Sequence, residues 1–177
     1  MIWESYYWKQ PLLESAKRLQ KLSELCSFED AEMVRLEKDI FIGFFSIRKL
    51  MDTFKISDAT KSHEILIHWF PNIKKVDYLN NHRIDDLYDL DNRNSENRTL
   101  RFICDQIVHS YVFVPLDNEH DGLDGFYIAS DRTKNSRVYF LSIQDVISIF
   151  TLVGNDYPSS SRFVRDAETG EFKAKVW

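Results

Sequence analysis

Apolar residues recur at helical spacing over the first 54 residues of the chain. The apolar positions on one face of residues 12–26 are Leu12, Leu19, Leu22 and Cys26. Pro11 suits the first turn of this helix, because the N–H that proline lacks is left unbonded there. A second repeat runs over residues 30–54, and Asp30 suits its N-cap. The pattern predicts two long antiparallel helices.

The pattern changes in the middle of the chain. Residues 63–70 alternate between apolar and polar positions and are rich in branched and aromatic side chains, which predicts a strand. A short buried helix is the alternative for this stretch. Residues 72–97 are mostly polar, and we expect a loop there after a short helix over residues 76–87.

Residues 98–114 are predicted to form one continuous helix. Its apolar face is made of Leu100, Ile103, Cys104, Ile107, Val108 and Tyr111. Thr99 or Ser95 can cap its N-terminus with a side-chain oxygen. We expect Pro115 to end it, because a proline ring clashes with the preceding helical turn.

The last third of the chain carries the signals of antiparallel strands. Residues 125–130 and 137–143 are two strand-like runs separated by a turn-rich stretch, which is typical of a hairpin. Residues 144–155 follow as a short helix that Gly154 is expected to stop. Residues 162–177 have the pattern of a second hairpin.

These elements predict an α+β fold in which helices precede strands. We expect an N-terminal helical bundle with long antiparallel helices over residues 1–114. A small antiparallel β-rich lobe over residues 115–177 is expected to pack on it.

Composition and charge restrict the class of protein. With 44% hydrophobic and 14% aromatic residues, the chain is expected to be globular. Its net charge of -5 argues against binding of nucleic acid over a broad basic surface, although a local basic patch is compatible with it. The sequence has no DNA-binding signature. Cys26 and Cys104 lie in apolar helical patterns, which favours core thiols in a reducing compartment. Without a leader-like N-terminus or a long apolar run, we expect a soluble cytoplasmic protein with no membrane segment.

Two charged residues fall on the apolar face of the second predicted helix. With Phe44 as the reference and ~100° per residue, Glu37 lies at roughly 20° and Arg48 at roughly 40°. They are three turns apart, about 16 Å, so they cannot neutralise each other. Each is expected to meet a partner from another element or to extend its charged end to solvent.

A row of ionisable residues lies opposite the apolar face of the helix predicted over residues 98–114. The row consists of Arg98, Arg101, Asp105 and His109. Residues four apart on a helix can touch, so Asp105 can pair with Arg101 and with His109. Such a row suits general acid–base chemistry, because a carboxylate orients the imidazole and a cation meets developing negative charge. The alternative is an ordinary solvated helix face.

Two stretches carry a family resemblance. GFFSIRKLMDTFKIS (residues 43–57) and CDQIVHSYVF (residues 104–113), with an arginine upstream of the histidine, resemble helices of the HEPN superfamily, the higher eukaryote and prokaryote nucleotide-binding domains. The resemblance covers about residues 10–114. It implies a helical domain, commonly a homodimer, that binds or cleaves RNA in a toxin or defence context.

The resemblance implies a metal-independent ribonuclease with His109, Arg101 and Asp105 as its catalytic residues. The supporting polar cluster would consist of Glu37, Arg48 and Arg98. Arg101 and His109 are further apart than the corresponding residues of the family. A non-catalytic interaction protein that dimerises or binds a protein partner is therefore the second interpretation.

No cofactor motif accompanies these residues, and we expect neither a cofactor nor a metal. Residues 117–122 place acids at alternate positions before Gly122, but the chain lacks the glutamate that a calcium loop requires at its twelfth position. The N-terminal aromatic residues are Trp3, Tyr6, Tyr7 and Trp8. They can stack against bases or bind a partner, or they can pack the terminus onto its own domain.

Overall fold

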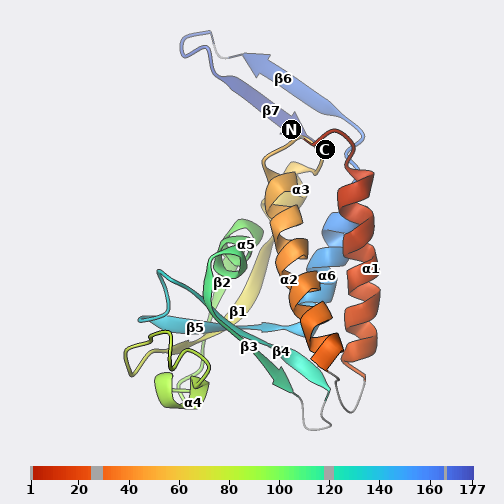
Figure 1. Cartoon of the computed structure of the whole chain (residues 1–177). Helices are drawn as coiled ribbons and strands as arrows, with labels where there is room; N and C mark the ends of the chain where they lie inside the picture. The colour runs from red at the N-terminus through yellow and green to blue at the C-terminus, as the bar shows by residue number, and fades with distance from the viewer. Residues whose placement is uncertain (1, 25–29, 118–121, 166) are drawn as a thin grey trace.

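The computed structural model describes residues 2–24, 30–117, 122–165 and 167–177, which form a mixed α+β fold (Figure 1). The helices are α1 (Tyr6–Leu22), α2 (Asp30–Met51), α3 (Asp58–Lys61), α4 (Ile84–Leu87), α5 (Leu100–Val108) and α6 (Ile143–Asn155). The strands are β1 (Glu64–Pro71), β2 (Asn94–Thr99), β3 (Ser110–Asp117), β4 (Leu123–Ser130), β5 (Arg137–Ser142), β6 (Ser161–Arg165) and β7 (Phe172–Val176). Among the described residues, no helix has both the length and the apolar character needed to cross a membrane.

Five strands form one antiparallel sheet in the order β2-β1-β5-β4-β3. β6 and β7 pair only with each other, in a separate two-stranded ribbon. The strand expected over residues 63–70 is confirmed as β1, and both expected hairpins are confirmed as β4-β5 and β6-β7. Alternation in β1, and strand-like runs with turn residues between them in the hairpins, were therefore sufficient signals for strands.

Both faces of the five-stranded sheet are covered. Ile67, Ile128 and Tyr139 point from one face into the larger core, which α1, α2, α5 and α6 complete. Phe70 and Val138 point from the other face into a smaller core, where α4 and its flanking loop pack (Figure 1). The sheet thus separates the long helices from the α4 layer.

The helical layer combines both ends of the chain. α1 packs against α2 and, more extensively, against α6. Gly154 lies inside α6, where a Cβ atom would come within 2.5 Å of the Leu13 side chain. Its missing side chain allows α6 to approach α1. The helix expected over residues 144–155 is confirmed as α6, which ends one residue after Gly154. A bundle made only of N-terminal helices is not confirmed, because the layer needs α6.

The bounds of the first two helices differ slightly from the expected ones. α1 begins at Tyr6, so Pro11 lies in the second turn and not in the first. α2 begins at Asp30 and ends at Met51, close to the expected end near residue 54. Cys26, expected on the apolar face of the first helix, lies outside the described residues.

The helix expected over residues 98–114 is much shorter. Thr99 caps α5 by accepting a hydrogen bond from the Phe102 N–H at 3.3 Å, but the helix ends at Val108. The following residues form β3, in which Val112 pairs with Ala129 of β4. The run from 110 to 114 is branched and aromatic, so it suits a strand once a partner strand is present. Pro115 lies within β3 and does not end a helix.

A second difference concerns the loop expected up to residue 97. Residues 94–99 form β2, the edge strand that pairs with β1. β2 is almost entirely polar, and its burial alternates only between intermediate and exposed, so hydrophobic alternation could not reveal it. The domain boundary expected at residues 114 and 115 falls inside β3, and β4 and β5 lie between β1 and β3 in the sheet.

Candidate nucleic-acid interface

The expected polar row on α5 pairs with α2 and not along its own helix. Arg101 Nη2 donates to Asp52 Oδ1 at 2.7 Å. Arg48 Nε donates to Asp105 Oδ1 at 2.8 Å, and Arg48 Nη1 donates to both Asp52 oxygens at 2.9 and 3.0 Å. The four side chains form a continuous series, Asp105-Arg48-Asp52-Arg101, that joins the two helices. We call it the α2–α5 ionic chain.

The ionic chain is electrostatically satisfied. The hydrogen bond to Asp105 raises the pKa of Arg48 above its ordinary value. Partial burial acts to raise the pKa of Asp52, but the hydrogen bonds and charges of Arg101 and Arg48 outweigh it and hold the pKa below its ordinary value. The opposite charges thus favour the charged forms of Arg48 and Asp52. Arg101 and Asp105 are therefore engaged in helix packing.

Glu37 does not lie on the buried face of α2. Its side chain is exposed, whereas Leu36 and Ile40 are buried. The buried residues of α2 are centred roughly 60° from Phe44 around the helix axis, because the helix packs against α1 as well as α5. Glu37 lies about 80° from the centre of this buried face. The expectation that Glu37 supports an inner polar cluster with Arg48 therefore rested on a wrong helix face.

Arg98 belongs to β2 and not to α5. Its Nε and Nη2 donate to the two carboxylate oxygens of Glu96 at 2.8 and 2.9 Å, and its guanidinium lies 4.6 Å from the centroid of the Phe102 ring. Glu96 also accepts a hydrogen bond from the Tyr139 hydroxyl at 3.0 Å. Arg98 is thus separated from the α2–α5 ionic chain and holds β2 to its neighbours.

His109 stands apart from Asp105. It is the exposed residue that follows α5, and only its main chain is bonded: its N–H donates to the Asp105 carbonyl and its carbonyl accepts from the Asp131 N–H. Within the described part of the chain, the imidazole forms no side-chain hydrogen bond. The structure therefore does not bring His109, Arg101 and Asp105 together as one hydrogen-bonded group.

The other sequence candidates contribute little chemistry. No group of three or more His, Cys, Asp or Glu side chains among the described residues could hold a metal ion. Most of the acidic segment 117–122 lies outside those residues. At the N-terminus, Trp8 packs against the larger core while Trp3 and Tyr7 are exposed. The interpretation that the aromatic residues pack the terminus onto its own domain is therefore confirmed for Trp8.

A series of rings and cations connects the start of α5, α3 and the segment after α2 to the β6-β7 ribbon, and its three rings are exposed. We call it the aromatic–basic strip, and it consists of Arg101, Lys61, Phe54, Phe163, Phe172 and Arg165. Arg101 and Lys61 line the same small hollow of about 230 Å³ beside α3. The strip thus begins at one end of the α2–α5 ionic chain and runs onto the β6-β7 ribbon.

Ring contacts make the strip continuous. Lys61 Nζ lies 5.9 Å from the centroid of the Phe54 ring, which is 4.9 Å from the Phe163 ring. The Phe163 and Phe172 rings are 5.8 Å apart, and the Arg165 guanidinium lies 5.6 Å from the Phe172 ring. Phe54 is 54% exposed, Phe163 45% and Phe172 59%. All three rings keep about half of their surface open to a ligand.

The ribbon that carries the strip projects beyond the helices (Figure 1). Its base is held at α3, where the Val176 N–H donates to Asp58 Oδ2 at 2.9 Å. All four charged residues of its two strands are basic, namely Arg162, Arg165, Lys173 and Lys175, although acidic residues outnumber basic ones by 28 to 23 in the chain. The basic excess is confined to the two strands, because the sequence DAETGE between them carries three acids.

Sequence reasoning identified the β6-β7 hairpin but not its chemistry. The signal was available in RFVR and FKAK, where aromatic and basic residues are interleaved, with three acids in the DAETGE stretch between the two runs. Phe54 and Lys61 could not have been joined to these strands from sequence, because they are about 100 positions away and meet the ribbon only in the fold. No family model, curated protein or solved structure matches the chain. Function must therefore be argued from the chemistry of the site.

Proposed function

We propose that this protein binds single-stranded RNA along the aromatic–basic strip and does not cut it. Bases stack on exposed aromatic rings, and neighbouring cations attract the phosphates, which is how proteins hold single strands without strong sequence preference. The observation that carries the proposal is the contiguous row of three half-exposed rings, Phe54, Phe163 and Phe172, with Lys61 at one end and Arg165 at the other. The resemblance of residues 43–57 and 104–113 to HEPN helices is a separate reason to choose RNA as the polymer.

Binding is favoured over cleavage by the state of the expected catalytic residues. Arg101 and Asp105 are held by Asp52 and Arg48, so neither is free to orient an imidazole. His109 has no carboxylate partner within the described residues. A general acid–base site needs the acid, the base and its orienting group within hydrogen-bonding reach of one another.

The proposal is tested by fluorescence anisotropy with a labelled, unstructured RNA of about one strip length at low salt. Phe172→Ala should weaken binding by about tenfold, since loss of one stacked base costs about 1–3 kcal/mol. Phe45→Ala is the matched control, because Phe45 is 44% exposed and has Lys49 Nζ 5.5 Å from its ring, but it lies on α2 outside the strip. Equal losses in the two variants, or no binding by the wild type, would refute the proposal.

The cleavage question needs its own readout. The same RNA is incubated with the wild type and with His109→Ala and is then examined on a denaturing gel. We expect intact RNA with both proteins. Cleavage by the wild type that His109→Ala abolishes would replace the binding proposal with the ribonuclease that the HEPN resemblance implies.

A second candidate function is self-association, and the ribbon is the observation that favours it. β6 and β7 pair only with each other, so each leaves one edge of main-chain groups unpaired within the described chain. Such edges can pair with a second copy of the same strand. Light scattering over a range of concentrations separates the two functions, because a monomer that still binds RNA eliminates this candidate.

A further inference from the structure

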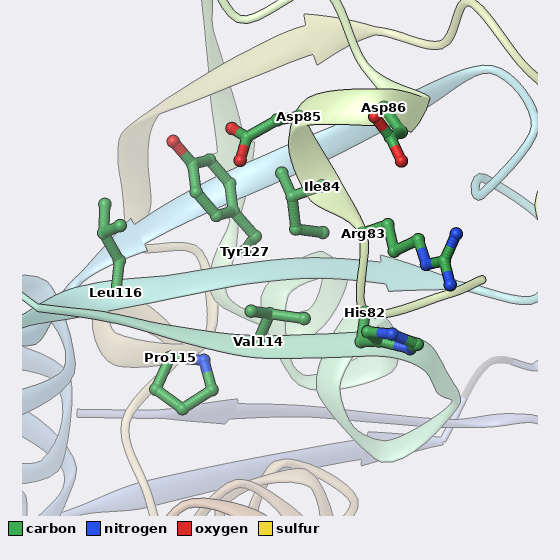
Figure 2. A pocket seen from close by; sticks show the side chains of 9 residues that line it. All are labelled: His82, Arg83, Ile84, Asp85, Asp86, Val114, Pro115, Leu116 and Tyr127. Carbon is green, nitrogen blue, oxygen red and sulfur yellow. The ribbon is translucent and has the colours of Figure 1, made fainter. Parts of the chain in front are cut away.

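Exposed charges of both signs surround the hollow between α4 and the β3-β4 pair. Figure 2 shows Asp86 on the same side as Arg83, and these two residues, His82 and Asp85 are all exposed to solvent. Because water solvates and screens such charges, they single out no class of ligand. Lys9 differs from them, because among the described side chains it is the only charged one that is buried.

The ammonium of Lys9 is held by the main chain. Its Nζ donates to the Lys55 carbonyl at 2.7 Å and to the Asp156 carbonyl, and it lies 4.0 Å from the centroid of the Tyr157 ring. A buried cation is costly unless hydrogen bonds or an aromatic face offset the loss of water. An apolar side chain would fill the same space without this cost. What distinguishes Lys9 from such a residue is that it holds the two carbonyls together.

These two carbonyls belong to the two halves of the aromatic–basic strip. Lys55 directly follows Phe54, the ring of the strip that precedes α3. Asp156 follows α6 and begins the segment that leads to β6, which carries Phe163. The centroids of these two rings are 4.9 Å apart. Lys9 therefore joins the chain segments from which the two rings project.

The ribbon has two further attachments, both to α3. Asp156 Oδ2 accepts from the N–H and the hydroxyl of Ser57 at 2.8 and 3.0 Å, and Ser57 caps α3. The Val176 N–H donates to Asp58 Oδ2. These contacts remain when Lys9 is changed. Loss of its ammonium should therefore shift the ribbon without detaching it.

We propose that Lys9 is a positioning residue of the aromatic–basic strip, whose ammonium keeps Phe163 beside Phe54. While the two rings are in contact, the strip offers three consecutive surfaces on which bases can stack. Without the ammonium, Phe54 is separated from the two ribbon rings and the row is shorter. The effect on RNA affinity rests on the proposed function, whereas the effect on the ring contact does not.

NMR spectroscopy of the full chain without RNA tests the ring contact. Lys9→Met keeps a side chain of similar length and removes its ammonium, and the nuclear Overhauser effect between the Phe54 and Phe163 rings should be lost. The effect between Phe44 and Phe150 in the larger core, whose centroids are 5.3 Å apart, should persist. An unchanged Phe54–Phe163 effect, or an equal weakening of both effects in a folded chain, would overturn the proposal.

Two further variants complete this test. Lys17→Met is the matched control, since Lys17 lies on the same helix and is exposed. A loss of the Phe54–Phe163 effect in this control equal to that in Lys9→Met would overturn the proposal. Tyr157→Leu decides the question if Lys9→Met does not fold, because it takes the ring away from the ammonium at a position that is 52% exposed. Selective weakening of the Phe54–Phe163 effect in Tyr157→Leu supports the proposal, and an unchanged effect overturns it.

The effect on RNA is measured by anisotropy with the same labelled RNA. Lys9→Met should weaken binding about tenfold, as for the loss of one stacked base. In a Phe54→Ala background the same change should weaken binding less than about twofold, because the ring that Lys9 positions is already absent. Equal losses in the two backgrounds, or full affinity after loss of the ring contact, would overturn the positioning role. Absence of RNA binding by the wild type would refute the proposed function, and the ring contact would still decide the role of Lys9.

Discussion

Arginines have different surroundings in the α2–α5 ionic chain and in the aromatic–basic strip. Arg48 donates to two carboxylates, one on its own helix and one on α5. Arg165 lies over the Phe172 ring, in a strand pair whose charged residues are all basic. The charge of Arg48 is neutralised by carboxylates within the fold, whereas Arg165 keeps its charge at the surface beside an exposed ring. The type of residue therefore says less about function than the partners that the fold supplies.

Arg101 connects the two regions. It donates to Asp52 in the ionic chain and also lines the hollow that contains Lys61 at the start of the strip. Of the residues expected to be catalytic, it is the one that the proposed RNA-binding surface retains. Arg101 was expected to be catalytic, but it lies at the boundary between the α2–α5 ionic chain and the aromatic–basic strip.

The largest expected effect is on RNA binding. Reversing two ribbon charges with Arg162→Glu and Arg165→Glu should weaken RNA binding by about 100-fold at low salt, because phosphate contacts and released counterions are lost together. The measurement is anisotropy at several salt concentrations, where the dependence on salt should also become shallower. Lys17→Glu with Lys21→Glu on α1 changes the net charge equally outside the strip. A matching loss in that control would show that overall charge, and not the strip, determines binding.

The next effect is on stability. Arg48→Met should lower the free energy of unfolding by about 1–2 kcal/mol, because Asp105 and Asp52 lose a charge-assisted partner while staying partly exposed. Thermal melting should fall by about 2–8 °C for a chain of this size, and RNA binding should be unchanged. Lys49→Met is the control, since the neighbouring Lys49 is exposed and forms no ion pair within the described residues. An unchanged melting temperature in Arg48→Met would mean that the ionic chain does not stabilise the α2–α5 contact.

The smallest expected effect is the acid dependence of stability. The folded-state pKa values of Asp52 and Glu96 lie below their ordinary values, because cationic partners outweigh the opposing effect of burial. A lowered carboxyl pKa stabilises the folded state fully above the unfolded pKa, and this contribution is lost as pH falls through the folded pKa. Urea unfolding from pH 6 to pH 3 should show this loss, and Asp52→Asn should make the acid slope shallower. An identical slope in wild type and Asp52→Asn would contradict the assignment of Asp52.

Local patterns predicted much of the fold. Alternation marked β1, and strand-like runs separated by turn residues marked both hairpins. Thr99, one of two expected caps, caps α5, because capping depends only on nearby residues. The polar strand β2 and the strand β3 were missed. The polar residues of β2 form a strand because they pair with β1. The apolar run of β3 is compatible with a helix or a strand, and its pairing with β4 decides for the strand.

The candidate site was predictable in part. Arg101 and the absence of a broad basic surface could be inferred from the sequence, and the ribbon was expected as a hairpin. The proximity of Arg101 to Lys61, and of Phe54 to the ribbon, could not be inferred from the sequence, because contacts between distant segments leave no periodic pattern. The wrong placement of Glu37 has a similar cause, since the centre of a buried helix face depends on which neighbours pack against it.

By itself, the sequence determined the mixed α+β composition, most strand positions and the supply of ionisable and aromatic residues. Only the tertiary structure decided which charges are neutralised. Arg48 and Asp105 are 57 positions apart and meet because α2 packs on α5, whereas Arg165 lies over the Phe172 ring of the ribbon, which extends beyond the helices. Coulomb attraction and hydrogen bonding act over a few ångströms in space and not along the chain. Whether a charged residue stabilises the fold or remains available to a ligand was therefore settled by packing.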